Sequence, residues 1–264
     1  MSPSPRPAAS LAVLLAVLLI TTPGLHAQVI LNTERYQIRE VDAFHLGADL
    51  SGSLQRGNTE VLDLSSSGIV GYRHERHWPR VIFGGRFLKD DDRSILDQQY
   101  IQLRYSYILT PSLQTFHFVQ AQKNETLLLR SRWLLGTGVQ RTFLETERTL
   151  ISAGTGVMGE WERLDPDRVA EDDLTSLDAI RMANVAVVRR EFQGGARLVN
   201  ISYVQPDLGE LSDLRILNDL GLTVPITETV RLTSSLEWRR DTRPPSTLAR
   251  DDVTMRMGIG FDIR

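Results

Sequence analysis

Cysteine is absent from the 264 residues, which excludes disulfide bonds, a thiolate metal site, a cysteine nucleophile and a lipid-modified N-terminal cysteine. Lysine is nearly absent too, since Lys89 and Lys123 are the only two, so arginine carries almost all of the positive charge. Arginine pairs with carboxylates in a planar, bidentate geometry that lysine lacks. The formal net charge is −3 with no concentrated basic stretch, so the sequence gives no reason to expect nucleic acid as a partner.

Long hydrophobic runs are missing as well. From Gln28 onward no run approaches the ~20 apolar residues that a membrane-spanning helix needs. The one apolar run, Leu11 to Ile20, is too short to cross ~30 Å of hydrocarbon as a helix. It follows Arg6 and precedes a small-residue site at Ala27, which is the order of a secretory signal peptide. We therefore expect export and cleavage between Ala27 and Gln28.

Helical periodicity is also lacking, and what recurs after the leader is alternation with period two, which is typical of strands. The last segment alternates strictly: apolar Val253, Met255, Met257, Ile259, Phe261 and Ile263 are separated by polar residues or glycine. Similar patterns begin at Phe44 and at Thr229. Nine further strands are expected near residues 60–73, 80–89, 97–109, 112–123, 130–143, 148–162, 176–190, 196–205 and 211–224. The pattern predicts twelve strands, although both faces of 112–123 and 176–190 are mixed.

Strand length separates two all-β classes. A soluble sandwich turns its charged face to water, whereas an outer-membrane barrel turns its apolar face to lipid and its charged face to the lumen. The segments run to about 10–15 residues, against a mode of about 5–6 in globular proteins. Bacterial single-chain barrels have an even number of strands. These features favour a closed antiparallel transmembrane β-barrel.

Aromatic residues and connections give two further indications. Aromatics lie near segment ends, as an interfacial girdle would place them: Phe44, Tyr72, Trp78, Tyr107, Phe143, Trp161, Tyr203 and Trp238.

Even-numbered connections, such as that at Thr110-Pro111, are short. Longer, charged odd-numbered ones are expected at Asp90–Ile95, Arg163–Thr175 and Asp241–Asp251. This parity matches short periplasmic turns and longer outer loops, although the first connection, Arg56-Gly57-Asn58, breaks it by being odd but tight.

Two stretches resemble a known family. Leu31-Asn32-Thr33-Glu34-Arg35 through Leu50-Ser51-Gly52-Ser53-Leu54-Gln55-Arg56-Gly57-Asn58-Thr59 is similar to the start of the salt-induced outer-membrane protein family, a domain family without assigned function. Leu134-Leu135-Gly136-Thr137-Gly138-Val139 resembles its glycine-bearing middle strand. The resemblance implies an outer-membrane β-barrel. The family has no established catalytic residues, so it implies none here.

The C-terminal strand carries a second resemblance. Arg256, Gly258, Phe261 and Ile263 match in type and spacing the signal that the barrel-assembly machinery reads on a last strand. The chain departs from that pattern at Arg264, because many such proteins end on an aromatic residue. The resemblance implies that this machinery is a partner during biogenesis.

Catalytic chemistry is hard to assemble from the residues present. A nucleophilic site needs a base beside an activated nucleophile. The mature chain has four histidines, His45, His74, His77 and His117, none with an evident partner. An outer-membrane phospholipase pattern would place a serine two residues after a histidine, but Val119 occupies that position after His117. We expect no catalytic residues, no cofactor and no metal.

Charged residues on the expected lumen face have two interpretations. They could line a narrow pore that prefers anions, or they could pair and brace a filled lumen; the mixed signs favour bracing. The predicted lumen charge network comprises Arg86, Arg104, Asp213, Arg215, Asp219, Arg231, Glu237, Arg239 and Arg256. Acidic runs such as Asp90-Asp91-Asp92 and Glu171-Asp172-Asp173 could bind divalent cations near lipopolysaccharide, but they have no fixed ligand spacing and are better interpreted as solvated loops.

The sequence thus predicts a signal peptide at 1–27, an N-terminal periplasmic lead-in at 28–43 and a β-barrel at 44–264 in the outer membrane of a Gram-negative bacterium. Outer-membrane lipid and lipopolysaccharide are its expected surroundings. The expected function is non-enzymatic, either structural and stress-related or as a narrow solute channel. The alternatives are a lipid-modifying outer-membrane enzyme and a soluble periplasmic β-domain that binds lipid or protein.

Overall fold

The computed structural model describes residues 43–55, 61–90, 93–227 and 229–261. The expected signal peptide at 1–27 and nearly all of the expected lead-in at 28–43 lie outside these residues. The described part is all-β and antiparallel, with one short 3₁₀ helix, η3 (Glu125–Leu127). Its thirteen strands are β1 (Ala43–Gln55), β2 (Val61–Arg73), β3 (His77–Asp90), β4 (Arg93–Thr110), β5 (Leu113–Asn124), β6 (Leu129–Glu145), β7 (Thr149–Leu164), β8 (Ser176–Met182), β9 (Asn184–Glu191), β10 (Arg197–Pro206), β11 (Leu214–Pro225), β12 (Val230–Asp241) and β13 (Asp251–Phe261).

The strands form one sheet in which sequence neighbours pair, except that β8 lies off the path. The expected strand at 176–190 is therefore broken in two. β8 pairs with Val157–Arg163 of β7, and β9 pairs with Thr149–Gly154, so the pairing skips two residues of β7. Ala183 bridges the break by donating its N–H to the carbonyl of Gly156 at 2.9 Å. Gly156 is required there, because a Cβ would lie 2.2 Å from the carbonyl oxygen of Thr137.

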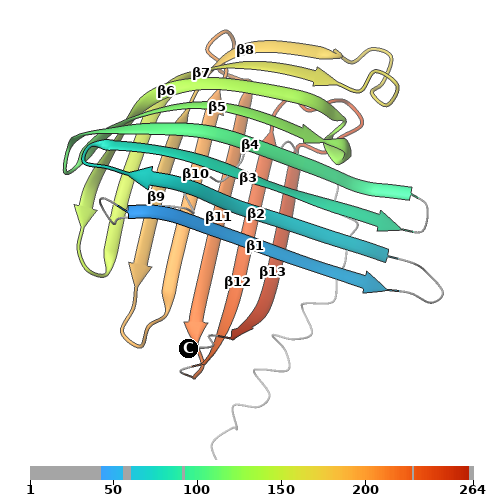
Figure 1. The fold of residues 1–264 in the computed structure, drawn as a ribbon. Coiled ribbons are helices and arrows are strands. Elements are labelled where there is room, and N and C mark those ends of the chain that lie inside the picture. The colour runs from blue at the N-terminus through green and yellow to red at the C-terminus, as the bar shows by residue number, and fades with distance from the viewer. Residues whose placement is uncertain (1–42, 56–60, 91–92, 228, 262–264) are drawn as a thin grey trace, which may run out of the picture.

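The sheet curls strongly, so that β1–β5 cross in front of β9–β13 while β6–β8 lie above them (Figure 1). The expected closure is not present: among the described residues, β1 pairs only with β2 and β13 only with β12. The inner face near these edges carries small side chains such as Ser65, Ser67, Ser235 and Thr254 beside charged ones such as Arg256. Twelve strands lie on the antiparallel path, so β1 and β13 have opposite directions along it.

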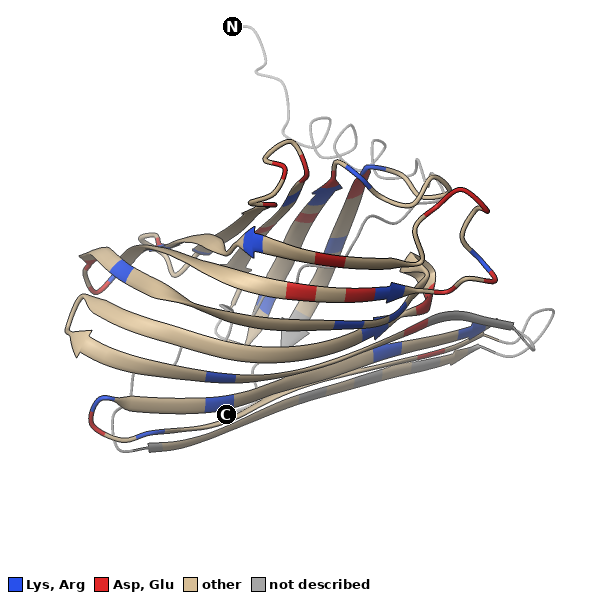
Figure 2. Cartoon of the chain, turned by 90° about the horizontal axis from the view of Figure 1, so that it is seen from above, with Lys and Arg blue, Asp and Glu red and all other residues tan. Residues whose placement is uncertain are grey.

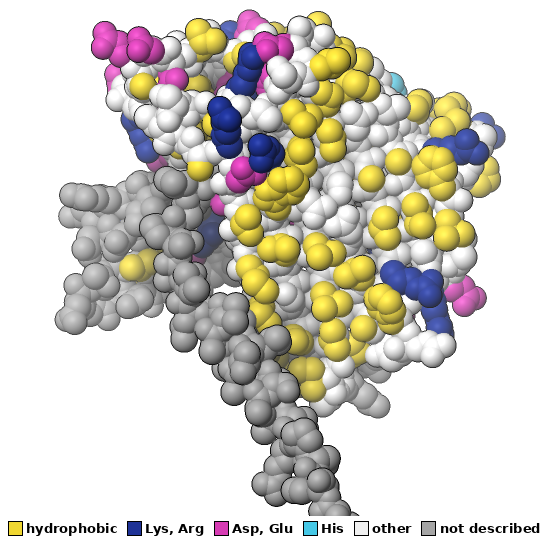
Figure 3. Space-filling view, turned by 180° about the vertical axis from the view of Figure 1, so that it is seen from behind, with side chains coloured by type: hydrophobic (Ala, Val, Ile, Leu, Met, Phe, Trp, Pro, Cys, Tyr) yellow, Lys and Arg dark blue, Asp and Glu magenta, His cyan; other side chains and the backbone are white. Residues whose placement is uncertain are grey.

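Alternation along the strands places apolar side chains outside and polar ones inside. On β6, Arg132 is 2% exposed whereas its neighbour Trp133 is 54% exposed. Buried inner side chains include Gln102, Arg104, Gln120, Glu160 and Arg215. Hydrophobic side chains cover much of the rear surface, and most charged ones there lie near its upper end or margins (Figure 3). The outside and inside of this sheet are reversed relative to a water-soluble β-sandwich.

Part of the interior is nevertheless apolar. Leu150, Val185, Val187, Ile201, Tyr203 and Leu217 form a buried cluster. Trp78 and Tyr203, which were expected in an interfacial girdle, are buried here and point away from the outer surface. Tyr72, Phe143 and Trp161 are exposed, as the girdle prediction requires.

Connections differ between the two ends of the strands. Short turns at 74–76, 111–112 and 146–148 join strands at one end, which we call the turn end. Longer segments, 165–175, 207–213 and 242–250, lie at the other, the loop end. The prediction of a long connection at Asp90–Ile95 was wrong, because β3 extends to Asp90 and β4 begins at Arg93. Among the described residues, no helix has the length and apolarity to cross a membrane.

Two segments at the loop end, 165–175 and 242–250, contact each other. Leu127, Leu129 and Leu164 are buried together with Val169 and Leu248 packed against them. The carboxylate of Asp173 accepts hydrogen bonds from the backbone N–H and the hydroxyl of Ser246, each at 2.9 Å. These contacts join the segments 165–175 and 242–250 over the strand ends.

Candidate functional site

A buried charge cluster lies on the inner face toward the loop end. We define it as three arginines and four carboxylates, each at most 9% exposed at its side chain: Arg132, Glu160, Glu162, Arg181, Asp213, Arg215 and Asp241. Strict alternation places these residues inward, since Trp161 between the two glutamates faces outward. Seen from above, acidic and basic positions are mixed on neighbouring strands (Figure 2).

Glu160 is the centre of the cluster. One of its carboxylate oxygens accepts from Arg181 Nε at 2.7 Å, and the other lies 3.0 Å from Arg132 Nε. The same carboxylate pairs with Arg215, although β9 and β10 lie between β7 and β11 in the sheet. Glu160 therefore links β7 to its sheet neighbours β6 and β8 and, through the ion pair with Arg215, to β11 across the interior.

The remaining members extend the cluster on both sides. Glu162 lies 2.5 Å from Arg132 and 3.2 Å from Arg215. Asp213 forms a bidentate pair with Arg181 at 3.1 and 2.9 Å. Asp241 of β12 accepts from Arg215 Nε at 3.1 Å. Every carboxylate thus has an arginine partner, which is what buried charges need to offset desolvation.

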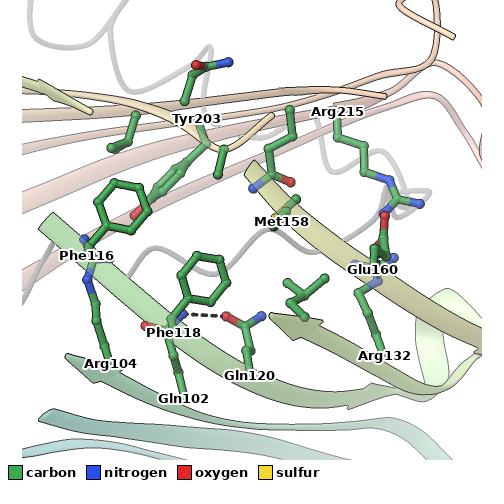
Figure 4. Close-up of a pocket in the computed structure, with 15 residues that line it drawn as sticks. Gln102, Arg104, Phe116, Phe118, Gln120, Arg132, Met158, Glu160, Tyr203 and Arg215 are labelled. Atoms are coloured by element: carbon green, nitrogen blue, oxygen red, sulfur yellow. Dashed lines mark hydrogen bonds and ion pairs between the residues drawn. The ribbon is translucent and has the colours of Figure 1, made fainter. Parts of the chain in front are cut away.

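Beside the cluster, the interior is almost filled. A cavity of about 50 Å³ is lined by Arg104, Phe116, Phe118, Tyr203 and neighbouring side chains (Figure 4). One water needs ~10–15 Å³ of such volume, so only a few waters fit. Gln102 donates to Gln120 at 2.8 Å across this space. Away from the cluster there is more space: a cavity of about 250 Å³ opens near the turn end between Trp78, Gln114 and Gln140, and one of about 1100 Å³ extends along β1–β6.

Glycines of β6 make room for the aromatic rings in this interior. A Cβ on Gly136 would lie 2.4 Å from the ring of Phe118, and one on Gly138 would lie 2.5 Å from the ring of Phe116. On Gly138 it would also approach the carbonyl oxygen of Thr155 to 2.4 Å. The two rings can fold over β6 because both positions lack side chains.

Residues 48–263 match the model of a family described as a protein of unknown function, DUF481. The chain belongs to the DUF481 family. Among curated proteins and solved structures, none matches it. The family match agrees with the expected resemblance in its coarser part, a domain of unknown function that covers most of the chain. Gly136 and Gly138, in the stretch similar to the expected middle strand, lie inside the matched range.

Of the predicted lumen network, the DUF481 structure brings only Asp213 and Arg215 into the cluster. Arg104 is buried, with its guanidinium 5.1 Å from the Phe116 ring centroid, and Asp219 is buried on β11. Arg86 pairs with Asp63 at 2.8 Å on β2 and β3, away from the cluster.

The predicted residues on the last two strands lie outside the cluster. Glu237 and Arg239 pair with each other at 2.7 Å, and Arg231 is half-buried. Arg256 is exposed, because the edge strand β13 has only one neighbour. It lies on β13 with Gly258 and Phe261 of the expected assembly signal, while Ile263 and the cleavage site at Ala27 and Gln28 fall outside the described residues.

Sequence reasoning missed five members of the cluster: Arg132, Glu160, Glu162, Arg181 and Asp241. Glu160 and Glu162 carried a usable signal, since they alternate with Trp161 and Gly159. Arg181 lay in a segment whose facing the sequence left ambiguous. Within the described residues, no group of three or more histidine, aspartate or glutamate side chains is arranged to hold a metal ion.

Proposed function

We propose that this chain is an integral outer-membrane β-barrel that closes in the bilayer and serves as a non-enzymatic structural component of the envelope. Its lumen is braced by the buried charge cluster rather than open for solute flow. The salt-induced character of the family it resembles belongs to the same proposal, as a role under envelope stress.

One observation carries the proposal, which is the reversal of the two faces. Large apolar side chains point outward from the middle of nearly every strand, including Leu103, Leu135 and Val157. Exposed apolar area costs about 25 cal/mol per Å² in water, and soluble monomers rarely expose patches above a few hundred Å². Hydrocarbon removes that cost. A soluble periplasmic β-domain, the main alternative, requires the apolar face to point inward.

The interior supports a brace over a channel. The cluster's carboxylates are held by arginines from other strands, and the adjoining cavity admits only a few waters. At the loop end, the contacts between Asp173 and Ser246 and around Leu127 hold segments over the strand ends. A pore lined by free arginines would instead leave its guanidinium groups facing solvent.

Closure is the step that the bilayer adds. An open sheet edge in hydrocarbon leaves backbone N–H and C=O groups unpaired, at several kcal/mol each. β1 and β13 run antiparallel, and their outer faces carry Leu46, Leu50, Met255 and Met257, all exposed. Pairing of these strands would complete a twelve-stranded apolar surface, with lipid and lipopolysaccharide around it and the barrel-assembly machinery as its partner in biogenesis.

Insertion and planar-bilayer recording test this proposal together. Protein refolded into lipid vesicles should resist carbonate extraction and migrate faster on gels when unheated, and it should give no stable single-channel current. Protein that stays in the soluble fraction would contradict the membrane assignment. Inserted protein with steady anion-selective conductance would favour the channel over the brace.

A further inference from the structure

A strip of polar side chains interrupts the apolar outer face. It runs across β5, β6, β7, β9, β10 and β11, and its members are His117, Thr137, Thr155, Asn184, Ser202 and Asn218. Each points outward, because its sequence neighbours on the strand point into the interior. The strip contains no aspartate, glutamate, lysine or arginine.

Hydrogen bonds connect the strip in two runs, one from β5 to β6 and one from β7 through β9 and β10 to β11. His117 Nδ1 and the Thr137 hydroxyl lie 2.9 Å apart, and the Thr155 hydroxyl donates to Asn184 Oδ1 at 2.7 Å. Asn184 Nδ2 donates to the carbonyl of Val204 at 3.0 Å. Asn218 Nδ2 donates to the Ser202 hydroxyl at 2.7 Å. The strip is therefore an ordered ladder and not a scatter of polar residues.

The ladder lies near the middle of the strands. Thr137 is central in the 17 residues of β6, with exposed Leu135 on its loop side and exposed Val139 on its turn side. Thr155 lies likewise between exposed Val157 and Ile151 on β7. In the proposed barrel, apolar bands above and below place the strip at mid-bilayer depth, where a lipid-facing surface should be most apolar.

Facing lipid, the ladder would leave hydrogen-bonding capacity unused. An asparagine amide offers two N–H groups and two acceptor positions. Asn184 donates one N–H to Val204 and accepts from Thr155, and within the described part of the chain its other N–H has no partner. In hydrocarbon, such groups act as adhesive between membrane segments, because only another polar surface can satisfy them.

We infer that the polar strip is a contact surface for a second copy of this chain. The inference rests on the proposed function. Two copies inserted in one orientation are related by an axis along the bilayer normal, so each strip meets its counterpart at the same depth. Amides and hydroxyls both donate and accept, so the strip is complementary to itself. Its lack of charge avoids like-charge repulsion, which fits a copy better than a charged partner.

Single-cysteine variants test the contact directly, because the natural chain has no cysteine. Thr155→Cys places a thiol on the strip. Leu64→Cys places one on the outer face of β2, away from the strip and 44% exposed. After insertion into vesicles at high lipid-to-protein ratio and mild oxidation, Thr155→Cys should give mainly covalent dimer on non-reducing gels, and Leu64→Cys at most a tenth as much. Equal dimer yields from both variants, or none from Thr155→Cys, would overturn the inference.

Replacing the amide side chains tests whether these polar groups stabilise the dimer or whether the two strips only lie close to each other. Asn184→Val with Asn218→Val should weaken dimerisation at least tenfold, measured by energy transfer between labelled copies in vesicles. Unchanged or stronger dimerisation would mean that the strip only faces lipid. Resistance to carbonate extraction, which reports membrane insertion, is measured first for each variant. Protein that fails to insert overturns both the proposed function and this inference, whereas inserted monomer overturns the inference alone.

Discussion

Glu160 of β7 and Arg215 of β11 form an ion pair across the interior, although two strands separate them in the sheet. Arg132 and Arg181 bind the same carboxylate from β6 and β8. Strands that share no backbone hydrogen bonds are thus held by side chains. Glu160 pairs with all three arginines of the cluster, which no other carboxylate in it does.

Glu160→Gln should lower the free energy of unfolding by ~3–5 kcal/mol, because it removes the charged partner that three buried arginines share. Asp178→Asn is the matched control. Asp178 pairs with Arg163 at 2.7 Å between the neighbouring strands, but both side chains are about half exposed. Such pairs contribute at most ~1 kcal/mol. Urea unfolding of both variants in detergent or lipid measures the difference, and equal losses would contradict a bracing role.

Gly138→Ala should destabilise the chain by ~1–3 kcal/mol, because the added methyl meets a backbone oxygen and the Phe116 ring. Gly221→Ala is the control, since its Cβ would meet only one atom, at 3.9 Å. The two variants are compared by the midpoint of thermal unfolding. If Gly138→Ala is as stable as Gly221→Ala, the packing of the aromatic rings over β6 does not require the glycine.

Closure predicts a specific cross-link. In an antiparallel β1–β13 pair, the start of β1 meets the end of β13, so Leu46→Cys with Ile259→Cys, or a pair shifted by two residues, should form an intrachain disulfide in the membrane. Leu54→Cys with Ile259→Cys places the thiols at opposite ends and should not. A sheet that stays open would give the same low yield for every pair.

Acid should loosen one loop contact without unfolding the sheet. Hydrogen bonds from the Ser212 hydroxyl and the Arg243 guanidinium hold the pKa of Glu210 below its ordinary value. Because the folded pKa is depressed, this stabilisation is present above the unfolded pKa and is lost as the pH falls through the folded one. Hydrogen exchange of segments 207–213 and 242–250 should rise below about pH 4. Glu210→Gln should show the faster exchange already at neutral pH.

Much of the fold follows from alternation alone. The strict pattern from Val253 to Phe261 predicted β13, and the strand at 130–143 appears as β6 with its apolar residues outward. The break at Ala183 could not be predicted, because it depends on how β8 and β9 share β7 as a partner. Trp78 was expected outside and is buried, since an aromatic ring has the same local pattern whether it meets lipid or interior.

The site was less accessible to sequence reasoning. Arg215 and Asp213 were predicted to face inward, but the partners that hold them come from β7, β8 and β12, far along the chain. Periodicity assigns a face and does not assign a partner across the interior. Arg231, predicted as a bracing residue, lies outside the cluster, so Arg215 takes its place as the position where substitution should cost stability.

Depth-dependent quenching tests the central claim, an apolar outer face in lipid around a braced interior. A single fluorophore on Leu135→Cys should be quenched strongly by lipids brominated near the middle of their chains and should be unreachable by a water-soluble quencher. Asp178→Cys, toward the loop end of the same outer face, should show the reverse. A fluorophore at residue 135 that the water-soluble quencher reaches and brominated lipid does not would contradict the account.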